Sequence, residues 1–373
     1  MTATQDPAAS PAAPGSAPAA PRGGVRVAVD AMGGDHGPAE VVPGAVAWAR
    51  AHPGDQLLLV GDERVLLGLV GDGPANVRLV HASQVIGMDE HPALALREKK
   101  DASILVATDL VRRGEADAVV TAGHTGAGMA AAVLRLGRIR GVDRPALAVQ
   151  MISGATPFVL LDIGANPDST PENLAQFARM AAIFSERVLG VRRPRVALLS
   201  IGEEKGKGDS RIARATELLD ATDLNFIGNV EGKDLTREMA DVVVCDAVLG
   251  NVVIKFFEGL STFIFDQFRG EFSRSIRGRL AYLLLRPGIA RIRKTFDYEV
   301  VGGSPLLGVR GAVIITHGRA RRRMIEHAVE VGARTARERV VERITEALGT
   351  AGRVDEAREA AVDEAVAAAE AEA

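Results

Sequence analysis

The chain has 373 residues, of which 47% are hydrophobic and 25% charged, a composition that is ordinary for a globular protein with a full core. Its formal net charge of −3 gives no support to a protein that coats nucleic acid, and no nucleic-acid partner is expected. A single cysteine, Cys245, excludes a disulfide framework within the chain and suits a reducing compartment. No uninterrupted run of about eighteen apolar residues occurs, so a soluble protein without a membrane-spanning helix is expected.

Both ends of the chain lack the large apolar residues that a core needs. Residues 1–24 are rich in Ala, Pro and Ser without the apolar stretch of a secretory signal, and predict a disordered extension. Residues 351–373 form an acidic, Ala-rich tail that is predicted to be disordered or a frayed helix. Residues 25–350 are predicted to form one α/β domain with a Phe- and Arg-rich helical insertion at about 252–294.

Between these ends, short runs rich in β-branched residues alternate with helical patterns. Apolar runs that end in a Gly- or Asp-bearing turn are typical of parallel strands covered on both faces. In chain order, the predicted strands are 25–29, 56–60, 76–80, 117–120, 158–161, 195–199, 241–244 and 312–315. The alternation predicts an α/β fold with a mostly parallel sheet, in which ligands bind at the carboxyl ends of the strands.

The turn after the first predicted strand combines carboxylates, a histidine and glycines. Asp30 ends the strand, and Gly33 and Gly34 permit a tight or left-handed turn. Asp35 and His36 follow directly. Two interpretations stay open: a tight turn in which Asp35 caps the next helix, or a binding site formed by backbone N–H groups and these polar side chains.

The turn after residue 120 is made of small residues and leads into an Ala-rich helix. It contains Gly123, His124, Thr125 and Gly126. Small residues let a ligand approach the backbone, and a helix N-terminus offers free N–H groups to an anion. The glycines lack the spacing of the dinucleotide fingerprint, and close packing of the helix against the sheet is the alternative interpretation.

A third turn follows the strand at 158–161. Asp162 closes that strand, Gly164 bends the chain, and Asn166 comes two residues later. Thr170 and Pro171 have the pattern of a helix N-cap followed by the first helical residue, and are interpreted as structural. Asp162 and Asn166 therefore remain as the functional candidates of this turn.

The fourth turn, at residues 200–208, carries two glutamates and the lysines Lys205 and Lys207. It is not a P-loop, because no G-K-[ST] stands at the required offset. Its lysines either clamp a phosphate or belong to a solvated charged loop.

The fifth turn joins a strand end to a helix that carries an amide and an ammonium on one face. Asp246 ends the strand, Gly250 and Asn251 open the helix, and Lys255 lies one turn after Asn251. This pair suits an anion. Cys245 is predicted to be buried and inert rather than nucleophilic.

A sixth turn is predicted at Gly302-Gly303-Ser304-Pro305, and the strand after it ends at His317. A histidine at a strand end can transfer a proton, and a satisfied structural histidine is the alternative. No metal site is predicted, because no H-E-x-x-H, paired C-x-x-C or clustered His and Asp set occurs.

Six phenylalanines fall between residues 256 and 272, and a basic stretch follows. Three uses compete with a simple buried helix: a dimer contact, a membrane surface, or a surface for an acidic partner. We favour a dimer contact whose exposed tip touches the membrane or an acidic protein. The residues predicted for this surface are Phe263, Phe265, Phe268, Arg274, Arg277 and Arg279.

Seven segments in this order resemble one family. They are DAMGGDHGP, TAGHTGAGMAAA, GRIRGVDRPALA, LDIGANPDSTPENLAQFA, SIGEEKGKG, VCDAVLGNVVIKFFEG and VVGGSPLLGVRGAVIITHG. Together they span residues about 25–330. Their combination resembles the phosphate acyltransferases, which transfer a fatty acyl group from acyl carrier protein to inorganic phosphate in bacterial phospholipid synthesis.

The resemblance implies a three-layer α/β/α fold similar to phosphotransacetylases and to the isocitrate-dehydrogenase-like group. It implies a cytoplasmic homodimer without a cofactor, associated peripherally with the inner face of the cell membrane. Its expected partners are acyl carrier protein, phosphate and the membrane acyltransferase that acylates glycerol 3-phosphate. The chain departs from the family pattern at His124, where Asn is more usual, and at residues 247–249, where Gly-Phe-Val is more usual.

Attack of phosphate on a thioester requires a positioned dianion, a stabilised oxyanion and protonation of the thiolate. We predict that phosphate lies among the glycine turns, with Asn251 and either Lys255 or Lys205 offsetting its charge. The residues predicted for catalysis are Asp30, His36, Asp162, Asn251 and Lys255. The residues predicted to bind substrate or phosphate are Gly33, Gly34, Asp35, Gly123, His124, Thr125, Gly126, Asn166, Lys205, Asp246 and Gly250.

Two alternatives come from other classes. One is a phosphotransacetylase or dehydrogenase relative that uses a small acyl-coenzyme A or NAD. The other is a non-catalytic scaffold that recruits lipid enzymes through residues 256–294. Six polar, small-residue turns at strand ends favour an enzyme over a scaffold.

Overall fold

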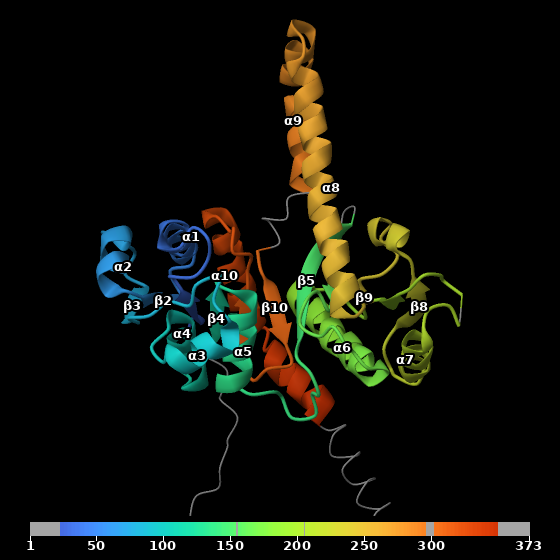
Figure 1. The fold of residues 1–373 in the computed structure, drawn as a ribbon, viewed down its shortest axis with the longest axis horizontal. Coiled ribbons are helices and arrows are strands. Elements are labelled where there is room, and N and C mark those ends of the chain that lie inside the picture. The colour runs from blue at the N-terminus through green and yellow to red at the C-terminus, as the bar shows by residue number, and fades with distance from the viewer. Residues whose placement is uncertain (1–22, 154–155, 205, 296–301, 350–373) are drawn as a thin grey trace, which may run out of the picture.

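The computed structural model describes residues 23–153, 156–204, 206–295 and 302–349 (Figure 1). The predictions for residues 1–22, for the tail at 351–373 and for Lys205 therefore lie outside the described residues. Within the described ranges, strands and helices alternate along most of the chain.

One sheet of eleven strands runs through the centre of the protein, in the order β3-β2-β1-β4-β11-β10-β5-β6-β9-β7-β8. The eight predicted strands are all present, with ends that differ by one or two residues. The strands are β1 (Arg26–Asp30), β2 (Gln56–Gly61), β3 (Val77–His81), β4 (Ala118–Thr121), β5 (Ala146–Ser153), β6 (Thr156–Leu161), β7 (Val196–Leu199), β8 (Phe226–Val230), β9 (Val242–Val244), β10 (Ser304–Leu307) and β11 (Ala312–Ile315).

The sheet consists of two parallel halves that run in opposite directions. In the first half, β1, β2, β3, β4 and β11 are parallel, and in the second half β6, β7, β8 and β9 are parallel. The halves join through β10 and β5, which pair antiparallel with each other. β10 also pairs antiparallel with β11 of the first half, and β5 pairs antiparallel with β6 of the second half. β5, β8 and β10 were not predicted, and the predicted turn at 302–305 was wrong in its second part, because Ser304 and Pro305 begin β10.

Helices cover both faces of the sheet, which confirms the predicted fold class. A further helix covers residues 340–349. The labelled helices are α1 (Pro38–Ala51), α2 (Glu63–Val70), α3 (Pro92–Glu98), α4 (Ser103–Arg112), α5 (Thr125–Arg135), α6 (Pro171–Phe184), the π-turn η1 (Ser185–Leu189), α7 (Ser210–Asp220), the 3-10 helix η2 (Gly232–Thr236), α8 (Ala247–Ser273), α9 (Ile276–Thr295) and α10 (Arg322–Arg337).

The two faces of the sheet are packed differently. On one face, a single buried cluster extends across both halves under α1, α10, α6 and α7. On the other face, the buried side chains form two clusters, one under α3, α4 and α5 and one under η2 and the start of α8. β5 contributes Leu147 to the first of these two clusters and Val149 and Met151 to the second. The face with two clusters therefore leaves space over β5.

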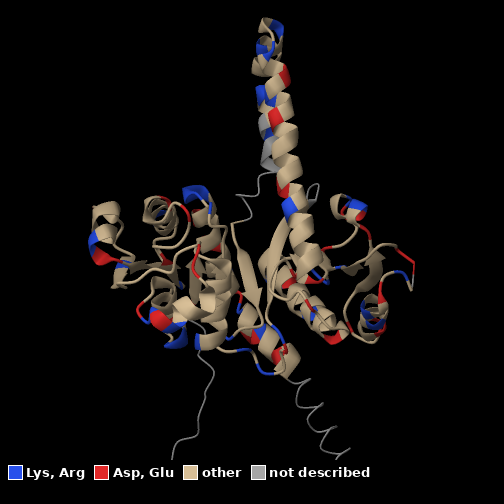
Figure 2. Ribbon diagram, viewed as in Figure 1, with Lys and Arg blue, Asp and Glu red and all other residues tan. Residues whose placement is uncertain are grey.

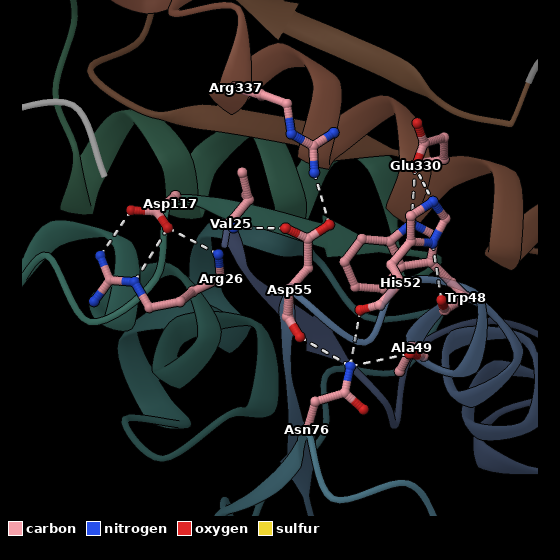
Figure 3. A network of polar contacts seen from close by, with 10 residues as sticks. All are labelled: Val25, Arg26, Trp48, Ala49, His52, Asp55, Asn76, Asp117, Glu330 and Arg337. Carbon is pink, nitrogen blue, oxygen red and sulfur yellow. Dashed lines mark hydrogen bonds and ion pairs between the residues drawn. The ribbon is translucent and has the colours of Figure 1, made fainter. Parts of the chain in front are cut away.

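A polar network attaches the C-terminal helix α10 to the first strands (Figure 3). The carboxylate of Asp55 accepts a hydrogen bond from the backbone N–H of Val25 at 2.7 Å and pairs with Arg337 at 2.6 Å. The indole of Trp48 donates to Glu330 at 2.9 Å. α10 is thus bonded to α1 and to the residue before β2, and these contacts hold the beginning and the end of the described domain together.

α8 and α9 form a helical hairpin that projects from the body of the protein (Figure 1). The only residues of α8 that are fully buried, Ala247 and Gly250, lie in its first turn, which excludes a simple buried helix. By length and composition, α8 is the one helix among the described residues that could cross a membrane. The expectation of no such helix is corrected, because it counted only uninterrupted apolar runs.

Candidate active site

A cleft of about 670 Å³ opens over β5, where the buried core divides into two clusters. Leu147, Val149 and Met151 of β5 form part of its wall. The N-terminal turns of α8 form another part, and the turns after β1, β6 and β11 reach its edges. Segments from both halves of the sheet thus converge on one cavity, as the sequence predicted for the strand-end turns.

Two residues at the start of α8 determine how this helix enters the cleft. Asp246 is its N-cap, since one carboxylate oxygen accepts the backbone N–H of Leu249 at 2.9 Å. Gly250 packs so closely that a Cβ atom there would lie 1.9 Å from the carbonyl oxygen of Asp162. Neither residue lines the cleft, and both orient the helix. The prediction that Asp246 and Gly250 bind phosphate stays a prediction.

α8 presents Asn251 and Lys255 to the cleft, where both side chains are exposed. The Lys255 ammonium lies 3.3 Å from Nε2 of His317 and 3.4 Å from the carboxylate of Glu258. Glu258 also pairs with Arg319 at 2.9 Å. The structure therefore places the predicted amide and ammonium in the cleft and adds a charged cluster to them.

His317 is the titratable group at the centre of this cluster. Burial lowers its pKa below the usual 6.5, and the nearby cations of Arg319 and Lys255 lower it further, against the opposite effect of Glu258 and Asp35. The imidazole is consequently neutral at neutral pH and can accept or donate a proton. Sequence reasoning named His317 only as an open alternative, and its position after a strand at the sheet edge was the signal.

The first two glycine turns pack against each other rather than around an anion. A Cβ atom at Gly33 would lie 2.8 Å from the backbone of Gly123, and both glycines are buried. The hydroxyl of Thr121 donates to Asp30 at 2.7 Å, and burial raises the pKa of that carboxyl. Asp30, Gly33 and Gly123 do not line the cleft, so the structure gives no support to the catalytic role predicted for Asp30 or to the phosphate site predicted at the two glycines, and both stay predictions.

Gly34 packs against the backbone of Ala122 and Gly318, and does not line the cleft. His124 caps α5, because its Nδ1 accepts the N–H of Gly126 at 3.0 Å. These contacts favour structural roles, and the predictions that Gly34, His124 and Gly126 bind phosphate stay predictions.

The turns after β1 and β4 also contain exposed residues, and only some of these face the cleft. His36 is exposed on the surface and does not contribute to the cleft, which removes it from the catalytic candidates. Asp35 and Thr125, by contrast, line the cleft, and Thr125 is the first residue of α5.

Asp162 is fully buried and organises the third turn. One of its oxygens accepts the backbone N–H groups of Leu147, Gly164 and Ala165 at 3.0–3.1 Å. The other accepts two hydrogen bonds from Asn166, each at 2.8 Å. The protein itself occupies both oxygens, which favours a structural role for Asp162 and Asn166, and the catalytic and substrate-binding roles predicted for them stay predictions.

Two further predictions concern residues away from the cleft. Cys245 is buried, and burial raises the pKa of its thiol well above 9, so that it is no nucleophile. Lys205 lies outside the described residues, and Lys207 of the same turn does not line the cleft. Among the described residues, no group of three or more His, Cys, Asp or Glu side chains could hold a metal ion.

The cleft thus combines an apolar wall with a polar edge of Asn251, Lys255, His317 and Thr125. Such a cavity suits a ligand with one apolar and one anionic part. The fold is shared with solved phosphotransacetylases. EutD phosphotransacetylase from Staphylococcus aureus and a phosphotransacetylase from Streptococcus pyogenes each match with a TM-score of 0.56 at 17% identity, over 84% of this chain and 94% of theirs. The protein is therefore of the phosphotransacetylase fold class.

Residues 25–343 match the family model described as "Fatty acid synthesis protein". Phosphate acyltransferase of Desulfitobacterium hafniense (strain Y51) is 45% identical over 326 residues, which cover 87% of this chain and 97% of that protein. Phosphate acyltransferase of Heliobacterium modesticaldum is 46% identical over 327 residues, which cover 86% of this chain and 97% of that protein. The chain belongs to this family of phosphate acyltransferases, and it is an acyltransferase enzyme.

Proposed function

We propose that the protein transfers a fatty acyl group from acyl carrier protein to inorganic phosphate, giving acyl phosphate and free carrier protein for phospholipid synthesis. The observation that carries this proposal is the cleft, in which an apolar wall meets a polar edge that includes Lys255, Asn251 and His317. Two relatives named phosphate acyltransferase match this chain over 97% of their length. This match supports phosphate as the acyl acceptor of this protein.

The apolar wall favours a long acyl chain over an acetyl group. Val248 and Val252 of α8 face the same cleft as Leu147, Val149 and Met151 of β5. Each buried methylene group contributes roughly 0.8 kcal/mol, so a fatty acyl chain gains far more from this wall than a small acyl group does. This observation favours a fatty acyl donor over the alternative of a small acyl-coenzyme A.

The polar edge of the cleft is suited to hold phosphate. The ammonium of Lys255 and the amide of Asn251 both face the cleft, and Thr125 brings the N-terminus of α5 to it. A helix N-terminus and an ammonium both stabilise an anion. Holding phosphate beside the thioester converts a bimolecular encounter into a reaction within one complex, which can supply much of the rate.

In the proposed reaction, an oxygen of hydrogen phosphate attacks the thioester carbonyl carbon, and the carbon–sulfur bond breaks as the tetrahedral intermediate collapses. Lys255 and Asn251 stabilise the oxyanion and the phosphate. The neutral imidazole of His317 takes the proton of hydrogen phosphate and delivers it to the departing thiolate. Acyl phosphate and free thiol result, and no covalent enzyme intermediate is required.

The projecting hairpin is the proposed contact with the membrane. Phe263 and Phe268 are exposed on α8, and Arg274, Arg277 and Arg279 are exposed near the turn to α9. Figure 2 shows basic segments, in blue, at the tip of the hairpin. Phe265 is half-buried. Each basic residue adds about 1 kcal/mol of attraction near an anionic lipid surface. We propose a cytoplasmic homodimer bound to the inner face of the membrane, where the acyl phosphate reaches the glycerol 3-phosphate acyltransferase.

The reaction is tested with the purified full chain, palmitoyl-carrier protein and phosphate. Acyl phosphate, trapped by hydroxylamine as the hydroxamate, should appear together with free carrier-protein thiol, and both should depend on phosphate. A parallel reaction with acetyl-coenzyme A tests the alternative donor. Turnover of acetyl-coenzyme A without turnover of the palmitoyl donor would refute the proposed substrate.

The hairpin is tested by co-sedimentation with vesicles. Vesicles of anionic lipid should carry the protein down, and vesicles of zwitterionic lipid should carry less. The double variant Phe263→Ser/Phe268→Ser should lose binding while its activity on soluble substrates persists. Unchanged binding by this variant, together with a change from dimer to monomer in sedimentation analysis, would assign the phenylalanines to the dimer contact instead.

A further inference from the structure

Glu258 forms ion pairs with both Lys255 and Arg319 and is more deeply buried than either of them. Its side chain is 16% exposed, whereas Lys255 is 52% and Arg319 is 45% exposed. A single carboxylate oxygen, Oε2, lies 2.9 Å from the Arg319 guanidinium and 3.4 Å from the Lys255 ammonium. The carboxylate thus lies inside, and the cations lie outside it toward solvent.

The cluster connects the two halves of the protein. Lys255 and Glu258 belong to α8, which follows β9 in the second half. His317 and Arg319 follow β11, in the first half. Beyond its first turn, α8 packs on the second half through Val253, Ile254 and Phe257. Glu258 therefore joins this helix to the opposite side of the cleft.

The charges explain why a carboxylate stands beside a proposed phosphate site. Two cations that approach each other repel, and one carboxylate between them removes that repulsion. Lys255, Arg319 and Glu258 together carry one positive charge, and Asp35, which also lines the cleft, offsets it. A phosphate can then draw on Lys255 while Arg319 stays bonded to Glu258.

Resting on the function proposed above, we propose that Glu258 is a positioning residue for acyl transfer, which holds Lys255 and Arg319 from opposite sides of the cleft beside His317. Its carboxylate does not contact the reacting atoms. An exposed ion pair contributes little to stability. The carboxylate of Glu258, by contrast, is largely buried, contacts two cations and lines the cleft.

The test variant is Glu258→Gln in the full chain, which keeps the shape and removes the charge. We expect kcat to fall at least tenfold while KM for phosphate changes less, because positioning rather than binding is lost. Glu258→Asp should recover part of the activity. Glu271→Gln is the matched control: Glu271 pairs with Arg274 at 2.7 Å on the exposed hairpin, and its loss should leave the rate unchanged.

A second readout is the titration of His317, followed by NMR of its imidazole in each variant, which needs no turnover. The charged groups facing His317 are Asp35, Lys255, Glu258 and Arg319. Removal of the Glu258 charge should move the midpoint to lower pH, because a carboxylate favours the imidazolium. Arg319→Gln should move it to higher pH, although both variants lower kcat. Opposite shifts would show that both charges lie beside the imidazole in solution, and the fall in kcat at an unchanged melting temperature then separates a positioning role from a structural one.

The outcomes separate the two proposals. If wild-type protein shows no transfer to phosphate, the proposed function fails, and the opposite His317 shifts still test the cluster. If wild type is active and Glu258→Gln, with an unchanged melting temperature, keeps its kcat and its His317 midpoint, the positioning role is overturned. If Glu258→Gln does not fold, Arg319→Gln decides instead. A wild-type kcat and a wild-type His317 midpoint in Arg319→Gln would overturn the positioning role.

Discussion

The carboxylate of Asp162, which lies beneath the turn whose Ile163 and Gly164 line the cleft, and the ammonium of Lys255, which faces the cleft, differ in what they contact. Asp162 is fully buried, and its two oxygens accept five hydrogen bonds from the protein. Lys255 is half exposed and faces the cavity beside His317. The difference teaches that a polar side chain at a strand end identifies a site only if the protein leaves it available. Four predictions test this division, from the largest expected effect to the smallest.

Asp162→Ala should affect stability most. It leaves the N–H groups of Leu147, Gly164, Ala165 and Asn166 without their acceptor, and those of Leu147 and Asn166 are buried. Since each unsatisfied buried group costs roughly 1–3 kcal/mol, we expect the free energy of unfolding to fall by about 3–5 kcal/mol in denaturant titrations. Asp168→Ala, at an exposed position of the same loop, is the control and should change little. A loss below about 1 kcal/mol in Asp162→Ala would break the comparison.

Lys255→Ala should show the opposite pattern. We expect kcat/KM for acyl transfer to fall by roughly 10²–10³, because a preorganised charge facing the reaction is removed. The free energy of unfolding should stay within about 0.5 kcal/mol of wild type, since the side chain is exposed. Lys100→Ala, another exposed lysine that does not line the cleft, serves as control. Near wild-type turnover in Lys255→Ala removes this residue from the mechanism.

Gly250→Ala tests whether packing alone positions the cleft wall. The added methyl group would meet the carbonyl oxygen of Asp162 at 1.9 Å, so α8 must shift, at a cost of about 1–3 kcal/mol in unfolding free energy. Activity should fall as well, although no polar group is lost. Gly259→Ala on the same helix has open space and should stabilise by about 0.5–1 kcal/mol through helix propensity. Equal stability of the two variants would contradict close packing at Gly250.

Glu40→Gln tests an ion pair away from the cleft and should have the smallest effect. The side-chain hydrogen bond from Arg322 lowers the pKa of Glu40 from 4.5 to about 2 in the folded protein. The stabilisation is therefore present above pH 4.5 and is lost as the pH falls toward 2. Because Arg322 is 65% exposed, we expect only about 0.2–1 kcal/mol at neutral pH. Unfolding of both proteins at several pH values measures it, and a difference that persists at pH 2 would exclude this pair as its source.

Part of the fold could be predicted from local pattern because the strands of the two parallel halves are short apolar runs that end in turns. The two strands at the junction, β5 and β10, and the edge strand β8 were missed. β10 begins with Ser304 and Pro305, a pair typical of turns, and its strand conformation depends on pairing with β11 and β5. In the site, Asn251 and Lys255 could be recognised together because they lie one turn apart on one helix.

The amino-acid sequence by itself determined the alternation of strands and helices, the family and the helix face that carries Asn251 and Lys255, because these depend on local pattern or on similarity along the chain. Only the tertiary structure decided which strand-end residues face the cavity. Asp30, Asp162 and Asp246 resemble site residues in sequence, yet their partners in the fold occupy them. The contact between Glu258 and Arg319, 61 residues apart, exists only because the two halves of the sheet meet.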